Sequence, residues 1–314
     1  FTNLPYEDGL FEAATYDPPY VCVDEETEIL TADGWRKWDQ VLVGQLAYGL
    51  DHETGEGTWA PIEDVIVLPA KDREVLSLEG QSHSSITTLD HRWPILRRRR
   101  SGESRTYERE FTTSRDLKAD DRVPLAARCR DLPTEASHSD AFVEVVAWFW
   151  TEGHLERGRR GEQLSYGKIS QSHVVNEPNC ERIRSALAAE FGPDNGLFPR
   201  TGLGPSDGKP RWREAESDHK AEFWFNSDLG SLLREVAPNR VPTHSFIRSL
   251  TSSQLDLFIE VSMLADGCET SGGSRNLAQK DPAAAGVFQF ACTLAGIATS
   301  IRAKNGYMTN VRLR

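Results

Sequence analysis

The stretch VVAWFWTEG, Val145–Gly153, has a counterpart in IEVSMLADG, Ile259–Gly267. Each stretch is apolar and ends in an acid followed by Gly, and each precedes a strand-like run that ends in a glutamine. An amphipathic run then follows in both copies, NEPNCERIRSALAAEFG and PAAAGVFQFACTLAG. Such self-similarity indicates one supersecondary unit used twice. The sequence therefore predicts a pseudo-two-fold domain built from a duplicated α/β unit over residues 140–314.

The predicted helices of this domain have capping residues at their starts. DAFVEVVAWFWTEG can begin at Asp140, and the second helix can be capped by Asn176 or Asn179 and stop at Gly192. The segment SSQLDLFIEVSMLADG repeats the first helix in outline. Gly at a helix end is common and needs no functional explanation. It does not explain why an acid precedes that Gly in both copies.

Two such helices packed on each other would bring Glu152 and Asp266 together at one end. Paired carboxylates beside phosphates form a hard-oxygen site for Mg²⁺. Metal ions at such a site activate water and stabilise the leaving oxygen of a phosphodiester. The repeat thus predicts a metal-dependent hydrolytic centre formed by these two acids.

The region from residue 27 to 126 has a different texture. Short alternating or apolar runs are separated by turn signals such as Asp33-Gly34, and no long helical periodicity occurs. This pattern predicts an all-β domain. The run Arg97–Arg100 is interpreted as a solvated loop, with a nucleic-acid contact as the alternative.

Composition limits the class of protein. A chain of 314 residues with 38% hydrophobic content can form more than one domain. No apolar window is long enough for a bilayer, and the net charge of −12 gives no general attraction to nucleic acid. We expect a cytoplasmic, monomeric protein without a membrane partner. The cysteines are odd in number, contain no CxxC pair and predict neither a disulfide framework nor structural zinc: Cys22, Cys129, Cys180, Cys268 and Cys292.

One cysteine is a candidate for a catalytic role. A free Cys is usually a small buried residue. Cys22, however, precedes the segment VDEETEILTADGW, and the downstream segment ITTLDHRW places Thr88 and His91 two residues apart. A histidine oriented by a threonine can donate a proton to a peptide group, which is what activation of an amide for attack requires.

These segments resemble the Hint fold of inteins over about Cys22–Ala126. CVDEETEILTADGW is similar to the first splicing motif, and TTLDHRW is similar to the second. The resemblance implies autocatalytic protein splicing without a cofactor, in which Cys22 attacks the carbonyl of Val21 to form a thioester. It implies that Thr88 and His91 distort and protonate the scissile amide.

The two nine-residue stretches resemble the LAGLIDADG homing endonucleases, which occur as insertions in inteins. The resemblance implies an α+β domain with a pseudo-two-fold αββαββα repeat. The resemblance implies that Glu152 and Asp266 bind Mg²⁺. It also implies active-site roles for Gln171, Gln279 and Lys280, with Lys280 polarising the scissile phosphate or its water.

The first copy departs from the family pattern at three positions. It has Trp148 and Trp150 where small or aliphatic residues usually allow close helix contact, and Ser172 where the second copy has Lys280. An asymmetric or decayed active site is therefore an open alternative.

The resemblance implies a double-stranded DNA partner, the host gene without its intein, across the Val21/Cys22 junction. Basic residues in or beside the predicted strands are candidates for contacts to phosphates or guanine edges, with ordinary surface as the alternative. The candidates are Arg157, Arg159, Arg160, Lys168, Arg211, Arg213, Arg275, Arg302 and Lys304.

Residues 1–21 would then belong to the interrupted host protein. The segment Asp17-Pro18-Pro19-Tyr20 resembles the motif of amino-group DNA methyltransferases. That resemblance implies that Asp17 and the Pro18 carbonyl accept hydrogen bonds from the target amine and that Tyr20 stacks on a flipped base. A proline-rich turn is the alternative.

The predicted domains are residues 1–21, 22–135 and 136–314. The final His is His244 and the final Asn is Asn310, so the expected C-terminal splicing motif is missing. A separate C-terminal intein fragment is therefore a candidate partner. Two alternatives stay open, namely a catalytically dead DNA-binding insert and the amino-terminal piece of a methyltransferase with a benign insertion.

Overall fold

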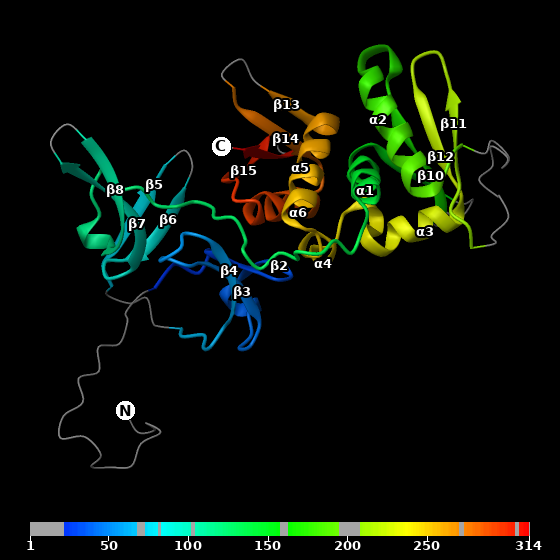
Figure 1. Ribbon diagram of the computed structural model, residues 1–314. Helices are drawn as coiled ribbons and strands as arrows, with labels where there is room; N and C mark the ends of the chain where they lie inside the picture. Colours follow the sequence, from blue (N-terminus) through cyan, green and yellow to red (C-terminus); the bar gives the residue numbers. More distant parts are fainter. Residues whose placement is uncertain are drawn as a thin grey trace, which may run out of the picture. The chain divides into compact units, whose positions relative to one another are not determined.

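The computed structural model describes residues 22–67, 73–80, 83–101, 104–157, 163–194, 208–269, 273–304 and 308–313 (Figure 1). The chain forms two compact units, each of which is described by itself. Unit 1 comprises Phe1–Thr27 and Val67–Val123, and unit 2 comprises Glu28–Ile66 and Pro124–Arg314. The division into domains at residues 21/22 and 135/136 stays a prediction.

The described part of unit 1 contains strands and one 3-10 turn, consistent with the predicted all-β texture. Two antiparallel pairs form, β5 with β6 and β7 with β8. Their bounds are β5 Val75–Glu79, β6 Ser84–Thr88, β7 Arg92–Ser101, β8 Ser104–Thr113 and the turn η2 Ser114–Asp116.

The interpretation of Arg97–Arg100 as a loop was wrong, because these residues lie in strand β7. Arg97 Nε donates to Asp121 Oδ1 at 2.9 Å, and Arg99 Nε donates to Glu108 Oε2 at 2.9 Å. Alternating residues of a strand project to the same face, where carboxylates of strand β8 and of the following loop compensate the positive charge. The arginine run is thus a strand with ion pairs within unit 1.

Unit 2 begins with a four-stranded antiparallel sheet in the order β2-β1-β3-β4. Its elements are β1 Glu28–Thr31, β2 Gly34–Lys37, η1 Trp38–Gln40, β3 Leu46–Leu50 and β4 Gly57–Pro61. The ring of Trp59 in β4 lies 6.2 Å from the ring of Phe290 in α6. This small sheet therefore shares its core with the C-terminal part of the chain.

The rest of unit 2 is built from two copies of one topology, which confirms the predicted repeat (Figure 1). The first copy contains α1 Asp140–Glu152, β9 Gly153–Arg157, β10 Gln163–Gln171, α2 His173–Phe191, β11 Trp212–Glu216 and β12 Ala221–Phe225. The second contains α5 Ser252–Asp266, β13 Gly267–Glu269, β14 Arg275–Gln279, α6 Pro282–Leu294, β15 Thr299–Lys304 and β16 Met308–Leu313. The sheet orders, β11-β12-β10-β9 and β15-β16-β14-β13, match strand for strand.

The helix starts follow the capping rules, with one correction. Ser139 Oγ accepts a hydrogen bond from Phe142 N at the start of α1, so this helix begins where the sequence predicts. Helix α2 begins earlier than expected, after the cap Ser172. Asn176 lies inside it with non-helical φ and ψ of −129° and 44°, which kinks the helix where we expected it to begin. The copies are joined by α3 Ser227–Val236, η3 Pro238–Arg240 and α4 His244–Arg248.

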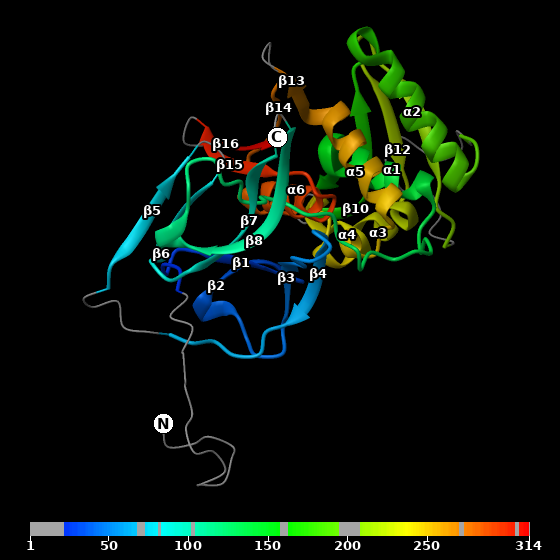
Figure 2. The same cartoon turned by 60° about the vertical axis from the view of Figure 1, so that its left-hand side comes forward.

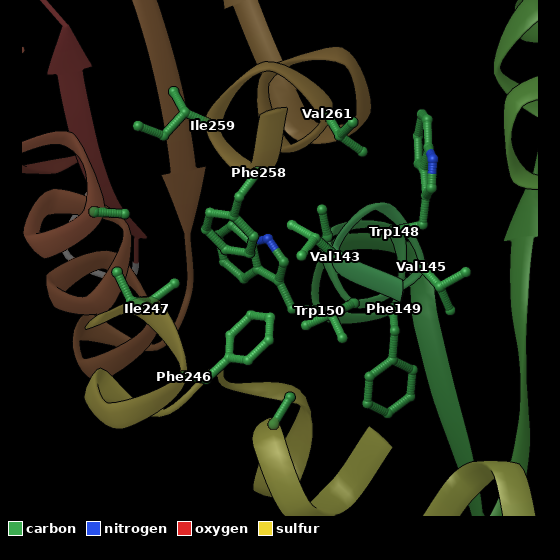
Figure 3. Packing of buried hydrophobic residues seen from close by; sticks show 14 of the residues in the cluster. Val143, Val145, Trp148, Phe149, Trp150, Phe246, Ile247, Phe258, Ile259 and Val261 are labelled. Carbon is green, nitrogen blue, oxygen red and sulfur yellow. The ribbon is translucent and has the colours of Figure 1, made fainter. Parts of the chain in front are cut away.

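Helices α1 and α5 pack against each other, and they lie side by side in Figures 1 and 2. Trp150 of α1 stacks at 6.1 Å on Phe258 and at 5.9 Å on Phe288, and its Nε1 donates to Ser262 Oγ at 2.9 Å. Figure 3 shows that Trp148 leaves α1 in another direction. The expected difficulty in packing two tryptophans does not arise, because only Trp150 points to the aromatic side chains of α5 and α6.

All five cysteines are free. Within the part of the chain that the structure describes, no helix combines the length and the apolar character that a membrane span requires.

Candidate active sites

The first candidate site lies in unit 1 and surrounds Cys22. The N–H of Cys22 donates to Thr88 Oγ1 at 3.2 Å, and the N–H of Thr88 donates to the carbonyl of Cys22 at 3.0 Å. An isolated antiparallel bridge between Val23 and Thr87 continues this pairing. The nitrogen of Cys22 belongs to the Val21–Cys22 peptide bond. The predicted threonine therefore contacts the nitrogen that the splicing hypothesis calls the leaving group.

His91 lies one turn beyond Thr88, because its N–H donates to the Thr88 carbonyl at 3.1 Å. Its ring meets Trp93 edge-on with centroids 4.9 Å apart, and its buried Nδ1 has no hydrogen-bond partner among the described residues. Burial lowers the pKa of His91, so the imidazole is neutral near pH 7. Cys22 itself is partly exposed rather than enclosed in the core.

Ser114, which holds the Thr88–His91 turn in place, was not predicted from any motif. Its N–H donates to the His91 carbonyl at 2.8 Å, and its hydroxyl lies 2.8 Å from Thr87 Oγ1. The same hydroxyl accepts from Trp93 Nε1 at 2.9 Å. One buried hydroxyl thus connects both strand ends that carry the predicted residues.

The second candidate site lies in unit 2, where helices α1 and α5 end. Gly153 and Gly267 follow the two acids with φ of −77° and −78°, so neither adopts the left-handed cap that usually explains a terminal Gly. A Cβ at Gly153 would lie 2.2 Å from the Phe149 carbonyl oxygen, and one at Gly267 would lie 2.3 Å from that of Met263. Glycine is required because the strand leaves the helix directly over its last turn.

Each acid is bound by the glutamine of its own repeat. Gln171 Nε2 donates to Glu152 Oε1 at 3.3 Å, and Gln279 Nε2 donates to Asp266 Oδ2 at 2.8 Å. Both glutamines end the second strand of their copy, β10 and β14. The structure therefore brings four sequence-predicted residues into two equivalent pairs.

The charge of Asp266 also acts on Glu152. Burial first, and the negative charge of Asp266 second, raise the pKa of Glu152 to about 7. Burial also raises the pKa of Asp266, although its side chain remains accessible to solvent. A carboxyl group that loses hydration beside a second carboxylate is costly to ionise. A cation between these groups would offset that cost.

The donor set fits a hard divalent ion that is shared with a substrate. Among the described residues, no group of three or more His, Cys, Asp or Glu side chains is placed to hold a metal ion. Mg²⁺ commonly takes one or two protein carboxylates and fills its other positions with waters and phosphate oxygens. Glu152 and Asp266 therefore suit an ion that also contacts a phosphodiester.

Cations near the acids include two that the sequence did not reveal. Arg240 Nη1 donates to the Gly153 carbonyl at 2.5 Å, and its charge lowers the pKa of Asp266. Arg240 and the preceding Asn239 have positive φ values of 66° and 54°, unusual for residues with a side chain. Lys220 lowers the pKa of Glu152. The predicted Lys280 is exposed and directly follows Gln279.

The predicted DNA-contacting residues divide between sheet faces. In the register of the first sheet, Lys168 and Arg213 are both opposite Trp224, in the row that alternates with the buried Ile169 and Phe223. These two basic residues thus lie on the sheet face turned away from the helices.

Lys168 is not available as a simple phosphate ligand. Its Nζ lies 2.6 Å from Glu222 Oε1 and 4.6 Å from the centre of the Trp224 ring. In the second sheet, Arg302 pairs with Asn310, whereas Arg275 lies in the row of the buried Leu277 on the side of α6.

The other predicted contacts have less definite positions. Arg157 ends β9, Arg211 precedes β11 and Lys304 ends β15. Several predicted residues lie outside the described residues: Asp17, Pro18, Pro19, Tyr20, Val21, Arg159 and Arg160.

No protein-family model matches the sequence, and a search of curated proteins found no match. The chain is similar to solved structures that include the following three. Mesophilic variants of the homing endonuclease I-DmoI give a TM-score of 0.39 at 9% identity and cover 56% of this chain and 88% of that one. The N-terminal LAGLIDADG domain of DUF199/WhiA gives 0.34 at 9% identity, over 59% and 80%.

The homing endonuclease I-WcaI bound to its DNA recognition sequence gives 0.34 at 9% identity, over 57% and 77%. I-DmoI has also been crystallised in complex with DNA and Ca or Mn. These TM-scores are too low to carry an inference about this chain.

Proposed function

We propose that unit 2 is a site-specific, Mg²⁺-dependent DNA endonuclease of the LAGLIDADG type. The observation that supports this most is the duplicated acid-amide pair, Glu152 with Gln171 and Asp266 with Gln279, at the ends of two helices in contact. A structural repeat alone would not require a carboxylate and its amide partner at both helix ends. A reaction on two DNA strands requires two equivalent centres.

In this proposal Glu152 and Asp266 hold the metal ions. Bound ions would supply activation of water and stabilisation of the leaving oxygen. Gln171 and Gln279 orient the carboxylates through the hydrogen bonds described above, and Lys280 places a positive charge beside the scissile phosphate. Because burial raises the pKa of Glu152 to about 7, this carboxyl group is fully ionised only above neutral pH.

Positive side chains on the outer faces of the two sheets would carry the DNA affinity. The net charge of −12 means that binding depends on these local contacts and weakens steeply with salt. The proposed target is the host gene without the intein, across the codons for Val21 and Cys22.

A cleavage selection tests this proposal. The substrate is a duplex library whose upstream half is the coding sequence for residues 1–21 and whose downstream half is randomised. With Mg²⁺ we expect the full chain to cleave both strands of a defined subset, and with Ca²⁺ to retain that subset without cleavage. Selective retention without cleavage would identify a dead DNA-binding insert. Neither retention nor cleavage would refute the proposal.

Unit 1 favours a second activity, because the Thr88 hydroxyl lies 3.2 Å from the nitrogen of the Val21–Cys22 peptide. We propose that Cys22 initiates an N–S acyl shift as in inteins. The Cys22 thiolate attacks the Val21 carbonyl carbon, the C–N bond breaks, and the released nitrogen takes up a proton to become the Cys22 amine. Thr88 positions the nitrogen, and His91 is the nearby group that transfers the proton.

Hydroxylamine traps this thioester. Treatment of the full chain should release residues 1–21 as the hydroxamate, and the release should be absent in Cys22→Ala. Thr88→Val should slow it without unfolding the β6 end, since valine keeps the shape of the side chain. A wild-type chain that stays intact after prolonged treatment would exclude the acyl shift.

Completion of splicing requires a His-Asn ending. We propose a methyltransferase as the host of residues 1–21. The coding sequence after the codon for Arg314 decides this point. Strands that end in His-Asn followed by Ser, Thr or Cys support splicing, whereas direct resumption of methyltransferase sequence supports a benign insertion.

A further inference from the structure

The two repeats differ in the residue that follows the glutamine. In the second copy Gln279 is followed by Lys280, whereas in the first copy Gln171 is followed by Ser172. The Ser172 side chain caps α2 by accepting from Val175 N. The first acid-amide pair therefore lacks a lysine at the position where the second has one.

Strand register shows where the first copy carries its cation. In the antiparallel pair β10 and β12, Gln171 is opposite Ala221. Ser172 directly follows Gln171, and Lys220 directly precedes Ala221. Lys220 thus lies at the end of the strand pair where the first copy lacks the lysine.

The second copy has the reverse arrangement. In the pair β14 and β16, Gln279 is opposite Thr309, and Lys280 directly follows Gln279. The lysine directly precedes the strand after the long helix in the first copy, and it directly follows the strand before that helix in the second. Both lysines are therefore adjacent in sequence to the residue pair that contains the glutamine.

Contacts of the turn before β12 fix the position of Lys220. Ser217 N donates to the Lys220 carbonyl at 2.9 Å, and His173 Nε2 lies 3.3 Å from the carbonyl oxygen of Asp218. His173 is the first residue of α2, so the turn is held against the end of β10. The Lys220 side chain is exposed, and its charge reaches the Glu152 carboxylate.

We infer that Lys220 is the phosphate-binding cation of the first half-site, taking the place of the lysine that is absent at position 172. This inference rests on the proposed endonuclease function. It assigns each DNA strand its own lysine, Lys220 beside Glu152 and Lys280 beside Asp266. In the first copy the lysine is then at position 220 instead of position 172, and the half-site is not lost.

Four variants of the full chain test the exchange: Lys220→Met, Lys280→Met, the double variant Ser172→Lys with Lys220→Met, and Lys209→Met as the control. Lys209 is an exposed lysine of the same repeat that precedes β11. The first measurement is the rate of nicking of each strand of the selected duplex with Mg²⁺. The second is the salt dependence of duplex affinity in EDTA, which requires neither metal nor cleavage.

We expect Lys220→Met and Lys280→Met to slow nicking of opposite strands by about 100-fold. Each should reduce the slope of log affinity against log salt by about 0.9, the value for one phosphate contact. Lysine at position 172 should restore both quantities in Lys220→Met, and Lys209→Met should leave the nicking rates unchanged.

The inference is overturned if Lys220→Met changes neither the strand-specific rate nor the salt slope, or if lysine at 172 restores nothing. Failure of the proposed function gives a different result. A wild-type chain that binds the duplex but never nicks it would refute the nuclease, while the salt slope and its restoration would still decide the position of the cation. A chain without duplex affinity would overturn both.

Discussion

The two repeats of unit 2 share a topology, yet they differ where α1 and α5 meet. Aligned through their acid-Gly ends, Trp150 of α1 corresponds to Leu264 of α5, and Trp148 corresponds to Ser262. Trp150 is 4% exposed and Leu264 is 44% exposed. Trp150 donates its indole N–H to Ser262, and Ser262 is the residue of α5 that corresponds to Trp148 of α1. The pseudo-symmetric interface therefore pairs a large residue with a small one.

This difference in packing shows that some features are kept in both repeats and others are not. The helix-strand junction, the acid and its glutamine occur in both copies, whereas the residue after the glutamine is Ser172 in the first copy and Lys280 in the second. The interior residues are free to diverge as long as their combined volume fills the core. The following predictions test whether the copies are equivalent in chemistry and unequal in packing.

The largest expected effect comes from the acids themselves. Glu152→Gln and Asp266→Asn each remove one metal-binding carboxylate, so each should slow cleavage by on the order of 1,000-fold, or about 4 kcal/mol of activation free energy. Strand-specific nicking of the selected duplex measures this, and Ca²⁺-dependent retention controls for folding. If one variant cleaves at the wild-type rate, that half-site is not catalytic and the equivalence fails.

Truncation of equivalent helix residues, in contrast, should lower the stability of the two copies unequally. Trp150→Ala leaves a cavity between α1, α5 and α6 and should lower the free energy of unfolding by about 3 kcal/mol. Leu264→Ala changes the equivalent, exposed position and should cost about 0.5 kcal/mol or less. Urea denaturation followed by far-UV circular dichroism compares the two. Similar losses would contradict the asymmetric interface.

A pH effect on stability should follow from Glu152. Its pKa rises from the usual 4.5 to about 7 in the folded chain, so the folded state holds a proton that the unfolded state has released between these values. This contribution is present below pH 4.5 and is lost as pH rises through 7, by about 2 kcal/mol after allowance for partial exposure.

Glu152→Gln removes the titrating group, so it should flatten stability between pH 5 and about 8. Glu269→Gln on strand β13 makes the same change of charge and serves as the control. Urea midpoints at several pH values measure the effect, and a wild-type curve that rises with pH over this window would contradict it.

The smallest expected effects come from the two glutamines, which should differ in their contribution to stability. Gln279→Leu removes one hydrogen bond to Asp266 and should slow cleavage roughly 5-fold, about 1 kcal/mol, with little change in stability. Gln171→Leu should lose stability as well, since Gln171 Oε1 also accepts from Ser172 N at 2.9 Å and Asn176 Nδ2 at 3.2 Å. Paired kinetic and urea measurements show the split. Equal stability losses would mean that the α2 start does not depend on Gln171.

Sequence alone determined the repeat, the all-β texture of the first hundred or so residues, and the acid-amide residues of the second site. These features are local, because helix periodicity, capping and the order of elements depend on neighbours along the chain. Thr88 and Cys22 were also found from motif spacing, and the structure then placed the threonine hydroxyl at the Cys22 nitrogen.

Only the tertiary structure placed Lys220 next to the Gln171–Ala221 pair, gave Arg97 its acidic partner and put Arg240 on the Gly153 carbonyl. These contacts join residues far apart in sequence, so they depend on which strands pair and in what register. A shift of register by one residue would turn Lys220 to the other sheet face. Hydrophobic pattern fixes which face is buried, whereas the partner of each exposed charge is decided by the assembled sheets.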